Sequence, residues 1–310
     1  MTFDPIKDIP SLEGKVVLVT GGNAGIGKAT IRALARHGPA KIYLAARRRD
    51  AAEATAAELE KETGYKGIVV LSLDLASFDS VRQCASTFTA LESRLDLLFL
   101  NAGVASTPPM LTQEGYEFQF GVNHMGHALL TQLLLPTLLQ TQAIQEDVRI
   151  HVTSSNAAYI PFLPADGINY ESLHHTGDHK PFVLYGQSKL ANALFARKLA
   201  VMYPTLSITA SHPGVVKSEI WDKDGGGLFS FVLRYLVIPL RVDIDEGSKT
   251  QLWCATAPLP KVQTGAFYFP VGKLHTYKGV SANQGIIDKL WEWTTSELAK
   301  HGATGWPAAK

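Results

Sequence analysis

The chain has 310 residues, of which 46% are hydrophobic and 18% charged, enough apolar material for a sizeable core, which excludes a disordered protein. Lys and Arg total 29 against 28 for Asp and Glu, and this lack of a basic surplus argues against a nucleic-acid partner. Two cysteines are too few for a disulfide scaffold, and the first fourteen residues resemble neither a secretion signal nor a membrane anchor. We therefore expect a cytoplasmic protein.

Short apolar segments alternate along the chain with longer helical patterns. We expect strands at 15–20, 41–46, 67–73, 95–100, 148–154, 206–211 and 265–270. We expect helices at 25–38, 50–64, 77–94, 112–140 and 181–203, with Pro136 bending or ending part of the fourth. Continuous apolar strands separated by helices indicate an α/β fold, a doubly wound parallel sheet of about seven strands with helices on both faces. No repeat or linker divides the sequence, so residues 1–310 are expected to form a single domain.

Two segments interrupt this alternation. Residues 160–180 are polar and rich in turn formers, and we interpret them as an insertion. Residues 219–242 contain the glycines 225–227 and then the apolar run 228–240, which is too short to span a bilayer. We expect this second segment to be a lid over the substrate; burial in the core and contact with a membrane are the alternatives.

A glycine-rich turn joins the first expected strand to the helix that follows it. Glycines let the chain turn tightly and bring backbone N–H groups against a pyrophosphate, while the helix N-terminus adds partial positive charge. The turn is therefore expected to bind a dinucleotide through Gly21, Asn23, Gly25, Ile26 and Gly27.

The same turn matches most of a P-loop, because Gly22 and Gly27 are followed by Lys28. A P-loop places a hydroxyl that binds Mg²⁺ next, and here that position is Ala29. The sequence therefore argues against hydrolysis of a nucleoside triphosphate.

Several motifs, in order along the chain, resemble those of the short-chain dehydrogenase/reductase family. They are the TGxxxGxG turn, Asp74 in SLDLAS, Asn101-Ala102-Gly103, the YxxxK of Tyr185 and Lys189, and the Pro213-Gly214 turn. The segments TGGNAGIGK, YLAARR, NHMGHALLT and YGQSKLAN are most similar to the retinol-dehydrogenase-like branch. The resemblance implies a Rossmann fold and oxidoreduction with a nicotinamide dinucleotide.

The resemblance also implies where the cofactor lies. Asp74 and Leu75 would meet the adenine, and Asn101, Ala102 and Gly103 its ribose. The cofactor would further contact Pro213, Gly214, Val216 and Ser218, and Ser218 stands where the family usually has a threonine that binds the carboxamide.

Tyr185 and Lys189 lie four residues apart on one expected helix, so both side chains project from the same face. A phenol has a pKa of about 10, and a neighbouring ammonium together with the positive nicotinamide lowers it. We expect Tyr185 to donate the proton in carbonyl reduction and Lys189, as in the family, to hold the nicotinamide ribose. The resemblance gives Ser155 a contact with the substrate oxygen and Asn123 a water in a proton relay. A helix-kink hydrogen bond is the alternative for Asn123.

One spacing departs from the family pattern. Ser155 and Tyr185 are 30 positions apart, more than twice the usual separation. The insertion at 160–180 must therefore loop out if the two hydroxyls are to converge.

The second expected strand is followed by Arg47-Arg48-Arg49 rather than by an acid. NAD enzymes place a carboxylate here to accept from the ribose hydroxyls, whereas a guanidinium grips a 2′-phosphate. We therefore expect NADP(H) rather than NAD(H), with Arg47 as the first contact and Arg48 and Lys28 as further ones.

The substrate side is expected to be apolar. Residues of the lid, with Ala157 and Tyr159, would line a pocket for a hydrophobic ketone or aldehyde, or for an alcohol in the reverse reaction. Reduction of an imine or an activated double bond is an alternative, as is a non-catalytic cofactor-sensing scaffold. Histidines at 124, 127, 174, 175 and 179 lack partners at metal-ligand spacing, so no metal is expected. A homo-oligomer is left open.

Overall fold

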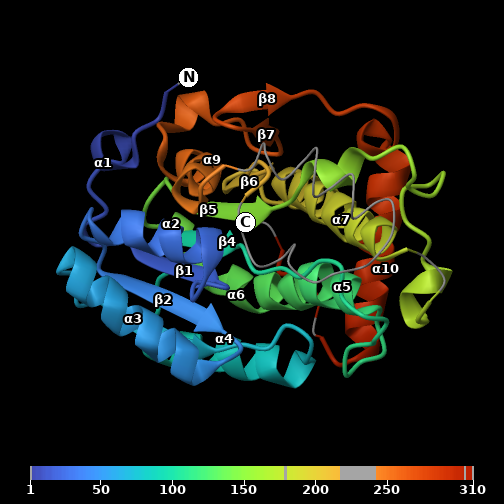
Figure 1. Cartoon of the computed structure of the whole chain (residues 1–310), viewed down its shortest axis with the longest axis horizontal. Helices are drawn as coiled ribbons and strands as arrows, with labels where there is room; N and C mark the ends of the chain where they lie inside the picture. The colour runs from blue at the N-terminus through green and yellow to red at the C-terminus, as the bar shows by residue number, and fades with distance from the viewer. Residues whose placement is uncertain (1, 178–179, 217–241, 304, 309–310) are drawn as a thin grey trace.

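A computed structural model of the chain describes residues 2–177, 180–216, 242–303 and 305–308. Its centre is one eight-stranded sheet in the order β3-β2-β1-β4-β5-β6-β7-β8 (Figure 1). All neighbouring strands pair in parallel except β7 and β8, which are antiparallel. The strands are β1 (Val16–Thr20), β2 (Lys41–Ala46), β3 (Ile68–Ser72), β4 (Leu97–Leu100), β5 (Arg149–Thr153), β6 (Ser207–Ser211), β7 (Phe267–Phe269) and β8 (Lys273–His275).

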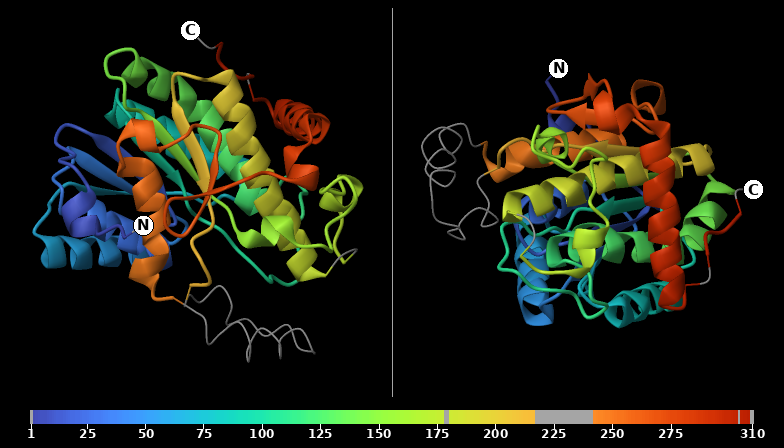
Figure 2. Two further views of the ribbon diagram at one scale, coloured as in Figure 1. Left: turned by 90° about the horizontal axis from the view of Figure 1, so that it is seen from above. Right: turned by 90° about the vertical axis from the view of Figure 1, so that its right-hand side faces the viewer.

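Helices cover both faces of the sheet, so that the molecule has three layers (Figures 1 and 2). One face packs on α2 (Gly25–Ala35), α3 (Arg49–Thr63) and α9 (Ile244–Thr256). The other packs on α4 (Phe78–Leu91), α6 (Gly126–Gln142) and α7 (Pro181–Met202), with α10 (Gln284–Lys300) against α7. Shorter helices are α1 (Pro5–Asp8) and α5 (Phe118–Phe120). Because both faces are covered, β1, β4, β5 and β6 are buried along their whole length. The continuous apolar sequences of β1 and β4 predict this, whereas β5 and β6 also bury polar side chains such as His151 and Thr209.

Local sequence explains the ends of several helices. The Ser77 hydroxyl accepts a hydrogen bond from the Ser80 N–H and caps the start of α4. Gly64 adopts a left-handed conformation, with φ of 76°, and its N–H bonds the Glu60 carbonyl at the end of α3. These caps place the ends of α3 and α4 where their sequences indicate.

The doubly wound Rossmann fold is confirmed, and the seven expected strands correspond to the parallel strands β1 to β7, to which the structure adds one more. The eighth strand, β8, is only three residues long and runs antiparallel to β7. Such a short segment has too few residues to show a period, so its pairing is decided by the turn that folds it back. No helix in the described ranges is both long and apolar enough to cross a membrane.

The helix expected over 112–140 begins six residues later and continues past its expected end. The Thr112 hydroxyl accepts from the Tyr116 N–H and the Thr112 N–H donates to the Tyr116 carbonyl, which closes a turn there instead of a helix. The Glu117 carboxylate then caps α5, which leads through a π-helical turn, Gly121–Met125, into α6. Pro136 does not end α6, because fully buried leucines on both sides hold the helix in place.

The insertion at 160–180 is largely irregular, with one short 3₁₀ turn at Glu171–His174. Its described part docks on α10: the Tyr170 ring lies 5.2 Å from the ring of Trp293, and the Lys289 ammonium lies 5.2 Å from the Tyr170 ring. The expected lid at 219–242 falls almost entirely outside the described residues. Val216 and Val242, which flank the gap, form a parallel β-bridge.

Candidate active site

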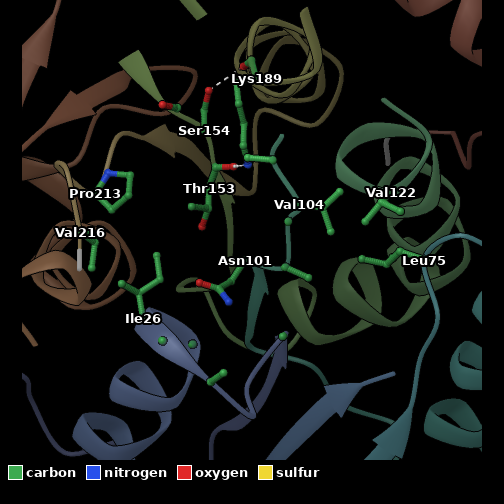
Figure 3. Close-up of a pocket in the computed structure, with 18 of the residues that line it drawn as sticks. Ile26, Leu75, Asn101, Val104, Val122, Thr153, Ser154, Lys189, Pro213 and Val216 are labelled. Carbon is green, nitrogen blue, oxygen red and sulfur yellow. Dashed lines mark hydrogen bonds between the residues drawn. The ribbon is translucent and has the colours of Figure 1, made fainter. Parts of the chain in front are cut away.

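The strand order reverses between β1 and β4, and parallel strands open a crevice at their carboxyl ends at such a point. A cavity of about 700 Å³ lies there (Figure 3). In Figure 3, Pro213 and Val216 lie on one side of this cavity and Val104 and Val122 on the other. The expected site residues that line it are Gly21, Asn23, Gly25, Ile26, Gly27, Arg47, Asp74, Leu75, Asn101, Ala102, Gly103, Ser155, Tyr185, Lys189, Pro213, Gly214 and Val216.

The cavity does not include every residue that the sequence indicates. Among the described residues, those expected at the site that lie outside its lining are Lys28, Arg48, Asn123, Ala157 and Tyr159. The expectation that Tyr159 lines the pocket is wrong for this structure, because its ring packs on Phe267 and His275, with centroids 5.3 and 4.5 Å away. Ala157 instead packs with Tyr185 in a small apolar cluster. Ser218 lies outside the described residues.

Two glycines of the turn, Gly21 and Gly27, leave little or no room for a side chain. A Cβ on Gly27 would lie 2.5 Å from Asn101 Nδ2 and within hard contact of the Gly21 carbonyl oxygen. Gly21 itself has a φ of 66°, and a Cβ there would lie 3.0 Å from Ala102 Cα. The turn therefore packs directly against the start of the Asn101-Ala102-Gly103 segment, and its backbone forms one wall of the cavity.

Lys28 faces away from the cavity. Its ammonium lies 2.7 Å from the Glu58 carboxylate on α3, and this contact lowers the pKa of Glu58. The next hydroxyl, Thr30, donates to the Ile26 carbonyl at 2.7 Å. Neither group is directed as a P-loop requires, in agreement with the sequence argument against that motif.

Arg47 follows β2 directly and lines the cavity with an exposed side chain. Its two neighbours differ from it: Arg48 stands at the N-terminal boundary of α3, and Arg49 bonds the Glu53 carboxylate at 2.7 Å. Within the described part of the chain, Arg47 has no hydrogen bond or ion pair. Of these three arginines, Arg47 is the one that lines the cavity, where its guanidinium can meet an anion.

The side chain of Lys189, on α7, is held at the carboxyl end of β5. Its ammonium donates to the Thr153 carbonyl at 3.1 Å, and the Ser154 hydroxyl donates to the Lys189 carbonyl at 2.6 Å (Figure 3). Ser154 thus ties β5 to α7, as expected of a structural turn residue. Burial lowers the pKa of Lys189 to about 8, because a desolvated ammonium is less stable than an amine.

Tyr185 and Ser155 converge despite the long insertion between them, and their side chains share a hydrogen bond. The Ser155 hydroxyl also accepts from the Ala157 N–H at 3.2 Å. Burial raises the pKa of Tyr185 to about 12, although the bond with Ser155 opposes this shift. Lys189 is thus not among the causes that shift the pKa of Tyr185 in this structure, contrary to expectation, and the phenol is protonated at neutral pH.

Asn123 occupies the π-helical turn and makes hydrogen bonds that stabilise its neighbours. Its amide donates to the Val104 carbonyl and to Ser188 Oγ, each at 2.9 Å, and its Oδ1 accepts from the Val104 N–H at 2.8 Å. A Cβ on Gly103 would lie 3.2 Å from both Asn123 Oδ1 and Lys189 Nζ. These contacts match the helix-kink alternative; the relay through a water stays a prediction.

Three buried polar residues support the cavity from below and were missed by the sequence analysis as site residues. Thr20 and His127 share a hydrogen bond of 2.9 Å. Gln251 on α9 accepts from Thr153 Oγ1 at 3.0 Å and donates to Asn101 Oδ1 at 3.3 Å. These partners are 98 or more positions apart, so no local pattern marks them. Among the described residues, no group of three His, Cys, Asp or Glu side chains is arranged to hold a metal.

Comparisons with known proteins agree with this architecture. A family model described as short chain dehydrogenase matches residues 15–226. A short-chain dehydrogenase/reductase of Armillaria gallica is 40% identical over 294 residues, covering 93% of this chain and 91% of that protein. Retinol dehydrogenase 12 of Mus musculus is 37% identical over 282 residues, covering 90% and 85%.

A solved structure also matches nearly the whole chain. It is a protein of Mycobacterium paratuberculosis described as putative and uncharacterized, at a TM-score of 0.72 and 27% identity, covering 99% of this chain and 100% of that one. The family match, the relatives and the arrangement of the cavity agree: the chain is an oxidoreductase of the short-chain dehydrogenase/reductase family and belongs to its retinol-dehydrogenase-like branch.

Proposed function

We propose that the protein uses NADP(H) to transfer hydride between the nicotinamide and the carbonyl or alcohol carbon of a hydrophobic small molecule. The observation that carries this proposal is the convergence of Ser155, Tyr185 and Lys189 in one cavity with the glycine-rich turn. A structural role for the three residues would not require them to share a cavity.

The residues present fit a dinucleotide. The backbone of Gly21 to Gly27 forms one wall of the cavity, and no Cβ can be added at Gly27 without a clash. Asp74 and Leu75 line the end beyond the turn, where the adenine would bind. Asn101 is held by donation from its Nδ2 to the Thr20 carbonyl at 2.8 Å, which fixes the floor between the two halves of the dinucleotide.

The preference for NADP(H) rests on Arg47. An exposed guanidinium lines the cavity where β2 ends, and a 2′-phosphate accepts forked, charge-assisted hydrogen bonds from such a group. Among the described residues, the acid that lines the cavity is Asp74, which follows β3, one strand further along the sheet, rather than β2. Lys28 contributes less, since Glu58 already neutralises it.

When bound, the nicotinamide supplies or accepts the hydride. Tyr185 is protonated at neutral pH and would give its proton to the substrate oxygen as the carbonyl carbon is reduced. The Ser155 hydroxyl, bonded to Tyr185, would donate to the same oxygen and orient it. Lys189, held by Thr153, would bind the nicotinamide ribose and stabilise the phenolate that remains.

The substrate end of the cavity is mainly apolar. Ala105 clusters with Tyr185, Phe182 packs against this cluster, and Phe118 and Val122 also line the cavity. Such a surface favours a hydrophobic carbonyl or alcohol. Several relatives carry the name retinol dehydrogenase, and retinol is an alcohol of this kind.

A screen of NADPH oxidation tests the proposal. Purified protein is mixed with NADPH or NADH and a panel of hydrophobic ketones, aldehydes including retinal, cyclic imines and activated alkenes, with Tyr185→Phe as the matched blank. Turnover of ketones or aldehydes with NADPH, absent in the blank, supports the proposal. Turnover of imines or alkenes alone, or binding of neither cofactor, contradicts it.

We also propose a cytoplasmic location, supported by two cysteines that are both free and buried, Cys84 and Cys254. Fractionation of cells that express the protein at natural levels tests it: recovery in the membrane pellet after a high-salt wash contradicts the proposal.

A further inference from the structure

A buried hydrogen-bonded chain runs beneath the cavity from the glycine-rich turn to α6. Thr20, the last residue of β1, accepts through Oγ1 from the N–H groups of Asn101 and Ala102, each at 2.9 Å. The same oxygen lies 2.9 Å from His127 Nε2, and His127 Nδ1 lies 3.0 Å from the Asn123 carbonyl oxygen. Thr20, Asn123 and His127 are each at most 1% exposed, so these bonds are shielded from bulk water.

The direction of each bond follows from chemistry. A carbonyl only accepts, so His127 Nδ1 must carry the proton that it donates to the Asn123 oxygen. Burial lowers the pKa of His127 to about 4, so the ring is neutral at pH 7 and Nε2 carries no proton. Thr20 then donates its hydroxyl proton to Nε2 at 2.9 Å, with the Phe99 carbonyl oxygen at 3.3 Å as a second and longer acceptor, while its lone pairs accept from Asn101 and Ala102. The shorter distance favours the bond to His127.

Each end of this hydrogen-bond network supports a different part of the site. At one end, Thr20 holds Asn101 and Ala102, against which the Gly21 and Gly27 backbones pack. At the other, His127 holds the carbonyl of Asn123, whose side chain fixes Val104. Gly103 lies between these supports, with Lys189 Nζ beside it.

We infer that His127 is a positioning residue. It fixes the Asn101-Ala102 segment, against which the glycine-rich turn packs, relative to the side of the site formed by Asn123 and Lys189. It is not part of the cavity lining; it acts through Thr20 at one nitrogen and through Asn123 at the other. The inference rests on the proposed function, because the quantities it predicts are cofactor affinity and turnover.

Two substitutions separate the two links. His127→Gln places an amide oxygen near the position of Nε2, where it can accept from Thr20, but cannot donate to Asn123. His127→Asn places an amide N–H near the position of Nδ1, where it can donate to Asn123, but removes the Nε2 acceptor of Thr20, whose hydroxyl then has only the longer contact to the Phe99 carbonyl oxygen at 3.3 Å. Each variant therefore retains one half of the network, and each acts as a control for the other.

The measurements are the Kd of NADPH by fluorescence titration and kcat with one ketone or aldehyde found active in the screen. His127→Asn is expected to raise the Kd about fivefold, the effect of one buried hydrogen bond, with kcat within about twofold of wild type. His127→Gln is expected to leave the Kd within about twofold and to lower kcat about fivefold. Thr20→Val removes the first link from its other side, together with the two bonds that Thr20 accepts from Asn101 and Ala102, so it should raise the Kd at least as much as His127→Asn.

His124 provides a matched control on the same helical segment. It is as buried as His127, but its Nε2 bonds Thr294 Oγ1 on α10 at 2.9 Å, away from the cavity. His124→Gln and His124→Asn should leave both Kd and kcat within about twofold of wild type, whatever their effect on the melting temperature.

The outcomes are distinguishable. Equal changes of Kd and kcat in the two His127 variants, or changes matched by the His124 variants, overturn the inference. If a His127 variant does not fold, an unchanged Kd in Thr20→Val overturns it and a raised Kd supports it. A wild-type protein that binds neither NADPH nor NADH contradicts the proposed function, and the inference fails with it.

Discussion

The Lys189 ammonium lies 5.6 Å from the centre of the Tyr185 ring, one helical turn further along α7. Both side chains are buried, and burial changes their pKa values in opposite directions, to about 12 for Tyr185 and about 8 for Lys189. In each case burial favours the neutral form. The pair is therefore a protonated phenol beside an ammonium that loses its proton close to physiological pH.

Tyr185→Phe should retain NADPH binding and lose turnover by about 100-fold or more, because the ring remains and only the proton donor is removed. Steady-state kinetics and fluorescence titration of NADPH measure the two quantities. Tyr159→Phe is the control, since Tyr159 is outside the cavity and its hydroxyl has no hydrogen-bond partner among the described residues. Turnover of Tyr185→Phe within tenfold of wild type would contradict the proton-donor role.

Lys189→Met should be more stable than the wild type at pH 7 by about 1–3 kcal/mol while losing activity, because a buried ammonium is expensive to desolvate. The folded-state pKa of about 8 lies below the ordinary 10.5, so between these values the unfolded chain binds more protons. Wild-type stability should therefore rise from pH 8 towards 10 relative to the variant. Urea unfolding at pH 7 and pH 9.5 tests this.

Lys198→Met is the control for that experiment. Lys198 is also on α7, but its ammonium is only partly buried and lies 2.7 Å from the Asp288 carboxylate. Its removal should not increase stability, and the difference from wild type should be the same at both pH values. If Lys189→Met behaves in the same way, the pKa of Lys189 is not lowered.

Arg47→Asp should raise the Kd of NADPH about tenfold or more and leave that of NADH unchanged or lower, because a carboxylate repels a 2′-phosphate yet accepts from a 2′-hydroxyl. Arg49→Asp controls for the change in net charge, since Arg49 pairs with Glu53 and is not part of the cavity lining. Should the ratio of the two Kd values equal that of wild type, Arg47 does not bind the phosphate. Arg48 or Lys28 would then be the next residue to test.

The sequence predicts this fold and much of its cavity because the signals are local. The glycine-rich turn, Asn101-Ala102-Gly103 and Pro213-Gly214 each follow an expected strand, and parallel strands bring their carboxyl ends together. Tyr185 and Lys189 are placed by helical spacing alone. The cavity thus collects short motifs whose positions in the chain already indicate one edge of the sheet.

Other features depend on tertiary contacts that leave no local pattern. Gln251 meets Asn101 across 150 positions, and Thr20 meets His127 across 107, so neither pair is visible from its neighbours. The displacement of Tyr159 from the pocket follows from its packing on Phe267 and His275, which come from β7 and β8. The sequence shows the charge of Lys189 beside Tyr185 and so predicts a lowered pKa. It does not show how deeply Tyr185 is buried, and burial raises the pKa instead.

Gly27→Ala should abolish NADPH binding and destabilise the protein by about 2 kcal/mol or more, as expected for overpacking against rigid backbone. The added methyl would lie 2.5 Å from Asn101 Nδ2 and closer still to the Gly21 carbonyl oxygen, so the turn must move away from the Asn101 segment.

Gly38→Ala is the control: its φ of 64° strains an alanine, but no atom lies within 4 Å of the added methyl. It should cost about 1 kcal/mol and leave the Kd of NADPH unchanged. Thermal unfolding and NADPH titration of both variants test the argument, and full NADPH affinity in Gly27→Ala would show that the packing of the turn does not define the cofactor wall.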